Sequence, residues 1–192
     1  IAPTSASDGI YTGACSVPTE LPSSQPSSPP TSRPSETEFS CSWSASQSNA
    51  LNWFGIASDD SAQFLSGVDL GGTIHYSEDY GVTWVASNAP TANWHGITLS
   101  SSGQYQVACI YDASSGGIYR SSDYGHTWAL SNSSPGLWAS VVSDASGQYA
   151  LVGYYDISIG KLYLSSDFGE NWVELSSSAV SAGSWVAIAM DA

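Results

Sequence analysis

Basic side chains are almost absent from this chain of 192 residues, which has three Lys and Arg residues against 17 Asp and Glu and a formal net charge of -14. Nucleic acids and anionic lipid surfaces bind proteins through clustered Lys and Arg, because these side chains displace the counterions of phosphate groups. The composition therefore argues against a nucleic-acid partner and against binding to an anionic membrane.

Long apolar runs are missing as well. No stretch approaches the roughly 20 apolar residues that cross a bilayer, so we expect no membrane insertion, and no window has the apolar spacing of a helix. Only 10% of the residues are charged, so Ser, Thr, Asn, Gln and Gly must cover the surface, as is typical of secreted glycoproteins. The chain begins at Ile1 without a signal segment, which is typical of a processed chain or an excerpt, and we expect an extracellular location.

Cysteine is scarce, and with Cys15, Cys41 and Cys109 one thiol stays unpaired whichever bridge forms. In a secreted protein, a disulfide between Cys15 and Cys41 would tie together the two ends of a Pro-rich segment. The alternative is that all three are buried thiols that act as small apolar side chains. No Cys-x-x-Cys spacing or adjacent His predicts a metal site, and we expect no cofactor.

One segment of eight residues occurs three times in this sequence. The copies read SEDYGVTW (77–84), SSDYGHTW (121–128) and SSDFGENW (165–172), and their closing tryptophans are 44 residues apart in both steps. Around each copy, short runs rich in aromatic and β-branched residues alternate with Ser, Gly and Asp, which predicts four strands joined by tight turns. Four strands in each repeat are typical of a β-propeller blade.

The pattern Ser-x-Asp-x-Gly-x-Thr-Trp resembles the Asp-box of the BNR repeat family, which occurs in sialidases, sortilin-type receptors, certain xyloglucan hydrolases and photosystem assembly factors. The resemblance implies a hairpin turn between the third and fourth strands of each blade. The Asp would accept hydrogen bonds from turn amides, the Gly would adopt a positive φ, and the Trp would pack between sheets. The residues in these structural roles are Asp79, Gly81, Trp84, Asp123, Gly125, Trp128, Asp167, Gly169 and Trp172.

We therefore expect an all-β fold, with the whole chain forming one propeller-like domain of about four four-stranded blades. Three blades are expected at residues 53–93, 94–137 and 138–184. The remaining blade is split between the termini. Residues 1–52 contain a second-strand equivalent that includes Tyr11 and a degenerate box at Glu38 to Trp43, and residues 185–192 supply the missing first strand with Trp185 and Ile188.

An unpaired strand with an apolar face needs a partner for its amides and its side chains. The joint at Tyr11, Trp185 and Ile188 has two ways to close. Closure within one chain gives a small four-bladed ring, and closure between chains gives a larger ring or a filament. A third alternative is that the sequence is a piece of a longer array.

Two segments predict attached glycans. Residues 18–34, PTELPSSQPSSPPTSRP, take the place of a strand in the split blade, and their proline content favours polyproline II. Their Ser and Thr residues are typical of O-glycan carriers, with a plain flexible loop as the alternative. Asn132-Ser133-Ser134 is an N-glycosylation sequon, followed directly by Pro135.

No catalytic residues are predicted. The resemblance to sialidases would require three arginines around a substrate carboxylate, but the chain has only Arg33 and Arg120. Asp69, Asp112 and Asp156 recur at one repeat position before a turn, which indicates a structural role, because a catalytic pair is needed only once. No grouping of Ser, His and Asp supports nucleophilic catalysis.

The first functional hypothesis is a secreted, non-enzymatic building block of an extracellular assembly, joined by strand complementation at the split blade. A carbohydrate-binding or carbohydrate-cleaving propeller is one alternative, because eight Trp and eleven Tyr residues offer rings for stacking on sugars. A receptor or assembly-factor module that binds a protein partner across the propeller face is the other.

Overall fold

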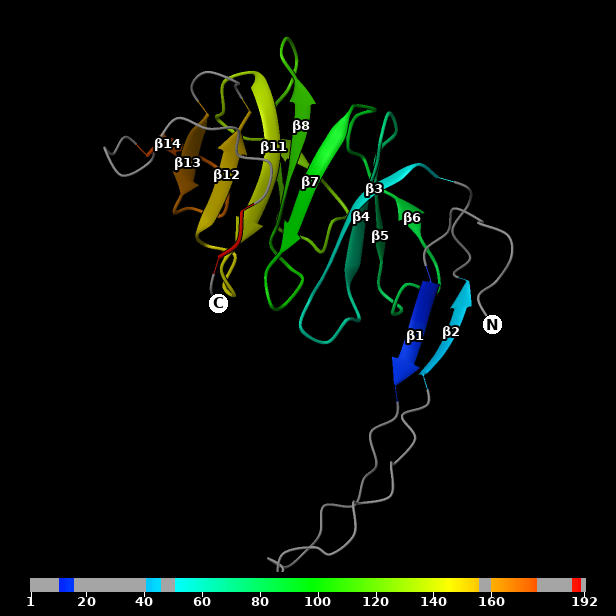
Figure 1. Cartoon of the computed structure of the whole chain (residues 1–192). Coiled ribbons are helices and arrows are strands. Elements are labelled where there is room, and N and C mark those ends of the chain that lie inside the picture. The colour runs from blue at the N-terminus through cyan, green and yellow to red at the C-terminus, as the bar shows by residue number, and fades with distance from the viewer. Residues whose placement is uncertain (1–10, 16–40, 46–50, 156–159, 176–187, 191–192) are drawn as a thin grey trace, which may run out of the picture.

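The computed structural model describes residues 11–15, 41–45, 51–155, 160–175 and 188–190. These residues form strands and turns and no helix, which confirms the expected all-β class (Figure 1). Accordingly, no helix within these ranges is long and apolar enough to span a bilayer.

The first complete blade, called blade 1, is an antiparallel sheet of four strands in sequence order. These strands are β3 (Trp53–Ser58), β4 (Leu65–Asp69), β5 (Ile74–Ser77) and β6 (Val85–Ala86). Asp, Gly and Ser separate the strands, because tight turns need residues that hydrogen-bond their own backbone or adopt a positive φ. The sheet therefore follows from short apolar runs between strong turn signals.

Blades 2 and 3 repeat this arrangement and share hydrogen bonds. Blade 2 consists of β7 (Trp94–Leu99), β8 (Gln106–Asp112), β9 (Ile118–Ser121) and β10 (Ala129–Leu130). Blade 3 consists of β11 (Gly136–Ser143), β12 (Ala150–Tyr154), β13 (Lys161–Ser165) and β14 (Val173–Glu174). Because the start of β11 also pairs with the end of β8, the two blades form one eight-stranded sheet. The total number of blades stays a prediction.

The hydrophobic core lies between successive blades. Val68 and Ile74 of blade 1 pack against Trp94, Ala108 and Trp128 of blade 2, and all five are buried. The same contact recurs one repeat later, where blade 2 meets blade 3 through Val107, Cys109, Ile118, Trp138 and Val141. Each blade thus has an N-side face, which meets the preceding blade, and a C-side face, which meets the following one.

Each Asp-box is a tight hairpin turn held by its own side chains. In the second box, the Asp123 carboxylate accepts hydrogen bonds from the Thr127 amide at 2.9 Å, the Thr127 hydroxyl at 2.6 Å and the Ser121 hydroxyl at 2.8 Å. The Gly125 amide donates to Ser121 Oγ, and the Trp128 indole donates to the Gly125 carbonyl. The other two boxes repeat these bonds, with Asn171 in place of the threonine in the third.

The hydrogen bonds of the box favour the ionised carboxylate. Partial burial raises the pKa of Asp123, but the bonds from Thr127 and Ser121 and the nearby His126 outweigh burial, so the pKa lies below its ordinary value. The carboxylates of Asp79 and Asp167 have lowered pKa values for the same balance of reasons.

The residue before each box glycine also has a positive φ. Tyr80 and Tyr124 have φ values of 61° and Phe168 has 59°, and the glycine after each lies between 79° and 84°. Two consecutive positive φ values are the mark of a type I′ hairpin turn. For an aromatic residue this conformation costs about 1–2 kcal/mol. The sequence predicted the glycine conformation but not this one.

The N-terminal part of the chain contributes a two-stranded hairpin. Strand β1 (Tyr11–Cys15) pairs antiparallel with β2 (Cys41–Ala45), and the register places Cys15 opposite Cys41. Directly opposed residues in such a pair have Cα atoms about 4.5–5.5 Å apart, within the range that a disulfide spans. The backbone register is therefore compatible with the disulfide, which stays a prediction, and the Pro-rich residues 18–34 lie outside the described residues.

Replacing Asp123 by Ala should lower the free energy of unfolding by about 1–3 kcal/mol at neutral pH, because the Thr127 and Ser121 donors lose their acceptor. The pKa of Asp123 is lower in the folded state, so this stabilisation is complete above about pH 4 and is lost as the pH falls through the folded pKa. Urea unfolding at several pH values measures both effects. The control is Asp60→Ala at an exposed loop position, and a pH-independent difference would contradict the assignment.

The predicted disulfide should leave one alkylatable thiol in the unfolded, non-reduced protein, and reduction should expose two more. Intact mass spectrometry after iodoacetamide treatment counts these adducts. The Cys109→Ser variant is the control, because its non-reduced form should then take up no adduct. Three adducts without reduction would show that Cys15 and Cys41 are not bridged.

Candidate functional site

The aromatic residue of each Asp-box packs on a ring from the preceding blade. Phe64 of blade 1 lies against Tyr124 of blade 2, with ring centroids 4.5 Å apart and planes tilted by 35°. Tyr105 of blade 2 lies against Phe168 of blade 3, with centroids 4.3 Å apart and the same tilt. Offset ring pairs of this kind contribute about 0.5–1.5 kcal/mol beyond the area they bury. The box aromatic therefore links neighbouring blades.

The same turn holds the first ring of each pair. In blade 1 the Asp59 carboxylate accepts the Phe64 amide at 3.0 Å, and in blade 3 the Asp144 carboxylate accepts the Tyr149 amide at 3.0 Å. The turns of successive blades are also in close contact: a Cβ atom on Gly147, whose φ is 74°, would lie 2.8 Å from the Cβ of Tyr105. Tyr149 thus occupies in blade 3 the position that Phe64 and Tyr105 occupy before it.

At each end of the array, one ring of such a pair has no partner among the described residues. The ring of Tyr149, on the last complete blade, is 45% exposed, and the box ring of blade 1, Tyr80, is 58% exposed. Among the described residues, no ring is paired with Tyr149 or with Tyr80. An interaction that is made twice inside the chain is therefore available at each end.

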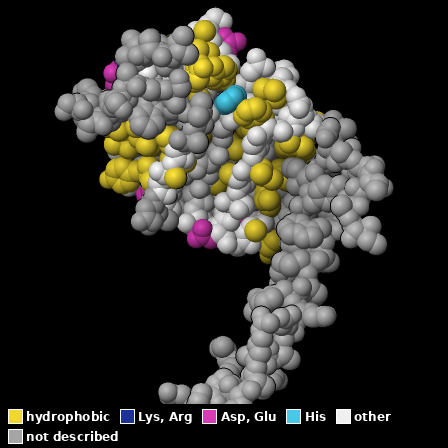
Figure 2. All heavy atoms as spheres, in the orientation of Figure 1, with side chains coloured by type: hydrophobic (Ala, Val, Ile, Leu, Met, Phe, Trp, Pro, Cys, Tyr) yellow, Lys and Arg dark blue, Asp and Glu magenta, His cyan; other side chains and the backbone are white. Residues whose placement is uncertain are grey.

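The aliphatic parts of the end faces are open too. Ile56 on the N-side face of blade 1 is 49% exposed, whereas Val141, at the same repeat position in blade 3, is 5% exposed. On the C-side face of blade 3, Leu162 is half-buried, although Ile118 at that position in blade 2 is fully buried. Figure 2 shows hydrophobic side chains gathered toward both the β12–β13 side and the β3–β4 side of the molecule. Apolar surfaces of this kind mark interaction sites.

The predicted joint lies only partly within the described residues. Tyr11 begins β1, whose pairing partner within the described ranges is β2. Trp185 lies outside the described residues, and Ile188 lies in a half-buried, non-strand segment. In Figure 1 residues 188–190 lie on the side of blade 3, whereas β1 lies beyond β6. The strand pairing expected at this joint stays a prediction.

The carboxylates that recur before the Gly-rich turn accept hydrogen bonds from backbone amides. Asp69 accepts the Asn52 amide at 2.9 Å, and Asp112 accepts the amides of Ser114 and Ser115. The bonds from the Ser114 amide and hydroxyl lower the pKa of Asp112. Asp156 lies outside the described residues. The described members of this set therefore have a structural task.

The histidines and the described cysteine side chain also have packing or hydrogen-bonding partners. His95 Nδ1 lies 2.9 Å from the Ala139 carbonyl, and His126 Nε2 lies 2.9 Å from Glu78 Oε1. Cys109 is buried between blades 2 and 3, and this burial raises the pKa of its thiol to about 12. Within the described ranges, no three His, Cys, Asp or Glu side chains gather into a metal-binding group.

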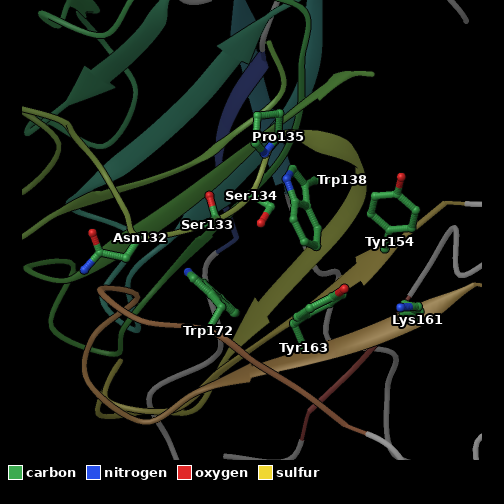
Figure 3. A pocket seen from close by; sticks show the side chains of 9 residues that line it. All are labelled: Asn132, Ser133, Ser134, Pro135, Trp138, Tyr154, Lys161, Tyr163 and Trp172. Atoms are coloured by element: carbon green, nitrogen blue, oxygen red, sulfur yellow. The ribbon is translucent and has the colours of Figure 1, made fainter. Parts of the chain in front are cut away.

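A cavity of about 350 Å³ lies where the β10–β11 connection passes over blade 3. Figure 3 shows the side chains of Trp138, Tyr154, Tyr163 and Trp172 on one side of it and the segment Asn132 to Pro135 on the other. Asn132 Nδ2 donates to Asn171 Oδ1 at 2.9 Å, and an N-glycan at this predicted site would replace one of the two hydrogens on the same nitrogen.

Sequence reasoning missed both the paired rings and this cavity. The signal for the pairs was present, because an aromatic residue recurs at 64, 105 and 149 and another at 80, 124 and 168. The cavity had no such signal, because its walls come from a loop and three strands that are separate in the sequence.

Two segments of this chain, residues 118–130 and 162–175, match the family model of the BNR-Asp box repeat. No curated protein sequence matches the chain significantly.

Several solved propeller structures resemble the chain. YCF48 bound to a D1 peptide is 14% identical with a TM-score of 0.52, and the match covers 69% of this chain and 42% of that chain. The GH74 enzyme of Niastella koreensis is 18% identical with a TM-score of 0.54, covering 69% and 24%. A chain of the nidogen/laminin complex is 14% identical with a TM-score of 0.58, covering 73% and 54%. This chain spans about a quarter to a half of their lengths, and the likeness shows the fold alone.

Replacing Tyr105 by Leu should lower the free energy of unfolding by about 1–2 kcal/mol, because the ring contact with Phe168 is lost. The matched change Tyr149→Leu, at an exposed ring in the same turn, should cost less than about 0.5 kcal/mol in a dilute monomer. Urea unfolding at low protein concentration measures both. Equal losses would show that Tyr149 is already packed within its own chain.

Proposed function

Because the chain carries BNR-Asp box repeats on a β-propeller-type fold, we propose that it is a non-enzymatic structural building block of an extracellular assembly. One observation carries the proposal: the two ends of the array expose the two halves of a contact that the inner blades bury. Tyr149 and Leu162 lie at one end, and Tyr80 and Ile56 lie at the other.

The two open faces differ from each other, so copies of the chain join head to tail. Such a heterologous contact produces a ring if the rotation closes and a filament if it does not. The inner interfaces show how a following blade fits each face, because blades 1, 2 and 3 use the same residue positions. The contact between two copies would therefore use the same residue positions as the contact between two blades of one chain.

In this proposal the split blade fills the position between two copies. Residues 185–192 of one copy supply its first strand, and β1 and β2 of the next copy supply the rest. By repeat position, Tyr11 corresponds to Tyr105 and would cover Tyr80 of its own chain, so the contact between copies would form where the split blade of the next copy meets Tyr149. Residues 188–190 and β1 lie at opposite sides of the array in Figure 1, and this separation favours a joint between chains over closure within one.

We place the assembly outside the cell and assign it O-linked glycans on residues 18–34 and an N-linked glycan at Asn132. The low content of charged residues and the Ser-rich and Pro-rich segment support this location. Intact mass spectrometry of protein from its native source reads the sugar load directly.

The two alternatives from the sequence differ in the partner. A protein-binding module would use the same open faces on a different protein, so the purified chain would stay monomeric. A carbohydrate-cleaving propeller would need a free pair of carboxylates, and the turn roles of Asp69 and Asp112 do not favour one.

Light scattering after size-exclusion chromatography, with electron microscopy, tests the assembly. The full-length chain should form rings or filaments at high concentration, and a chain without residues 185–192 should be monomeric. Tyr149→Asp should weaken the assembly at least about tenfold, because a charge would be buried at the joint. A monomeric full-length chain would contradict the proposal.

The matched control is Leu130→Asp. Leu130 is an exposed apolar residue on the edge strand β10, away from both end faces, so this variant should assemble as the unchanged chain does. If Leu130→Asp and Tyr149→Asp weaken the assembly to the same extent, the copies associate through general surface hydrophobicity and not through the proposed joint.

A further inference from the structure

We propose that the cavity of blade 3 is a binding site for a neutral pyranose sugar. This inference does not rest on the proposed assembly, because the cavity lies within one chain. At about 350 Å³, the cavity is within the size range of small-ligand pockets. The argument rests on its aromatic walls, on one unpaired donor and on the difference between blade 3 and blade 2.

Aromatic rings form the floor and one side of the cavity. Trp138 packs edge-on against Tyr154 and Tyr163, with ring centroids 5.3 Å and 5.1 Å away. Trp172 completes the aromatic wall, and its indole donates to the Gly169 carbonyl at 3.1 Å. Gly136 permits this arrangement, because a Cβ atom there would lie 2.5 Å from the Tyr154 ring. Flat rings with fixed orientations suit the C–H face of a pyranose.

The Trp138 indole N–H is a buried donor without an acceptor. Trp138 is 2% exposed, and among the described residues its Nε1 atom has no hydrogen-bond partner, as is also the case for the Trp53 indole of blade 1. Leaving a buried polar group unpaired costs about 1–3 kcal/mol, so such a group points to a missing acceptor. In Figure 3 the indole nitrogen lies on the side of Ser134 and Pro135, and because the atom is buried, a ligand would reach it only by displacing this segment.

The corresponding tryptophan of blade 2, unlike Trp138, has an acceptor for its indole N–H. The Trp94 indole donates to the Pro90 carbonyl at 3.1 Å, and Trp94 is fully buried beneath its loop. Ser134 occupies the repeat position of Pro90, but its carbonyl does not accept the Trp138 indole. The loop of blade 3 thus leaves a space and an unpaired donor where blade 2 has a direct bond.

The polar groups around the cavity match a sugar better than other ligands. Ser134 Oγ both donates and accepts, and Lys161 Nζ, which already donates to Glu174 Oε2 at 2.8 Å, has further hydrogens to donate. Sugar hydroxyls can satisfy donors and acceptors together. A proline-rich peptide has fewer donors, because proline lacks a backbone N–H, and the net charge of -14 disfavours an anionic ligand. A neutral hexose fits both the rings and the polar groups.

Two sources could supply this sugar: a glycan from outside the chain, or the chain's own N-glycan at Asn132, which lines the same cavity. A glycosylated Asn132 would keep one N–H, which could still donate to Asn171. The chemistry recognised at Trp138 is the same in both cases.

The test is saturation-transfer NMR and tryptophan fluorescence on the full chain made without glycosylation. Methyl glucoside, methyl galactoside and methyl N-acetylglucosaminide serve as probes at millimolar concentration. At least one sugar should receive saturation and shift the fluorescence with a saturable curve. Trp138→Phe, which keeps a ring but removes the N–H, should weaken binding at least about tenfold.

Two further variants keep the test decisive if Trp138→Phe unfolds the protein. Ser134→Phe places a ring at the exposed rim of the cavity and should abolish binding, whereas Thr91→Phe adds the same ring to the loop of blade 2 and should not change it. Absence of binding to all three sugars, or equal binding by Ser134→Phe, overturns the proposal. Binding of a peptide with the sequence of residues 18–34 in place of any sugar overturns it as well.

Protein from a glycosylating host identifies the source. If glycosylated protein binds no added sugar but its Asn132→Gln variant does, the attached glycan fills the cavity. If both bind added sugar equally, the ligand comes from outside the chain. Each result supports the site.

Discussion

Burial of one tryptophan from each blade against the blade before it is the interaction on which this array depends. Trp94 and Trp138 are almost completely buried, and each packs against aliphatic residues supplied by the preceding blade. A sheet of four short strands cannot bury two apolar faces by itself, because stable burial needs a second layer. The blades therefore stabilise one another, and the free energy of the fold lies mainly between repeats.

The Asp-box connects local turn chemistry to this packing. Its hydrogen bonds hold Tyr124 and Phe168 in a left-handed conformation that aromatic residues rarely adopt. That conformation directs each ring onto the preceding blade, where Phe64 and Tyr105 meet it. The cost of the positive φ is thus offset by contacts in a different blade, which explains why each box has an aromatic residue before its glycine.

The repeats and the all-β class could be predicted from the sequence because the periodic Trp, Asp and Gly residues act within one turn or one strand. The ring pairs and the cavity could not, because they depend on side chains from different segments. Pro90 and Ser134 occupy one repeat position, yet only the Pro90 carbonyl reaches the indole below it. That difference is set by the path of a loop, which single-sequence patterns do not encode.

Arrays of repeats usually end in caps with a polar outer face, since the last repeat has no neighbour to cover its apolar side. The described end blades of this chain lack that feature: Ile56 and Tyr80 lie open on blade 1, and Tyr149 lies open on blade 3. The net charge of -14 opposes contact between copies, so apolar contact at these faces would have to outweigh that repulsion. The proposed joint rests on this likeness between the exposed rings of the described end blades and the buried rings of the inner interfaces.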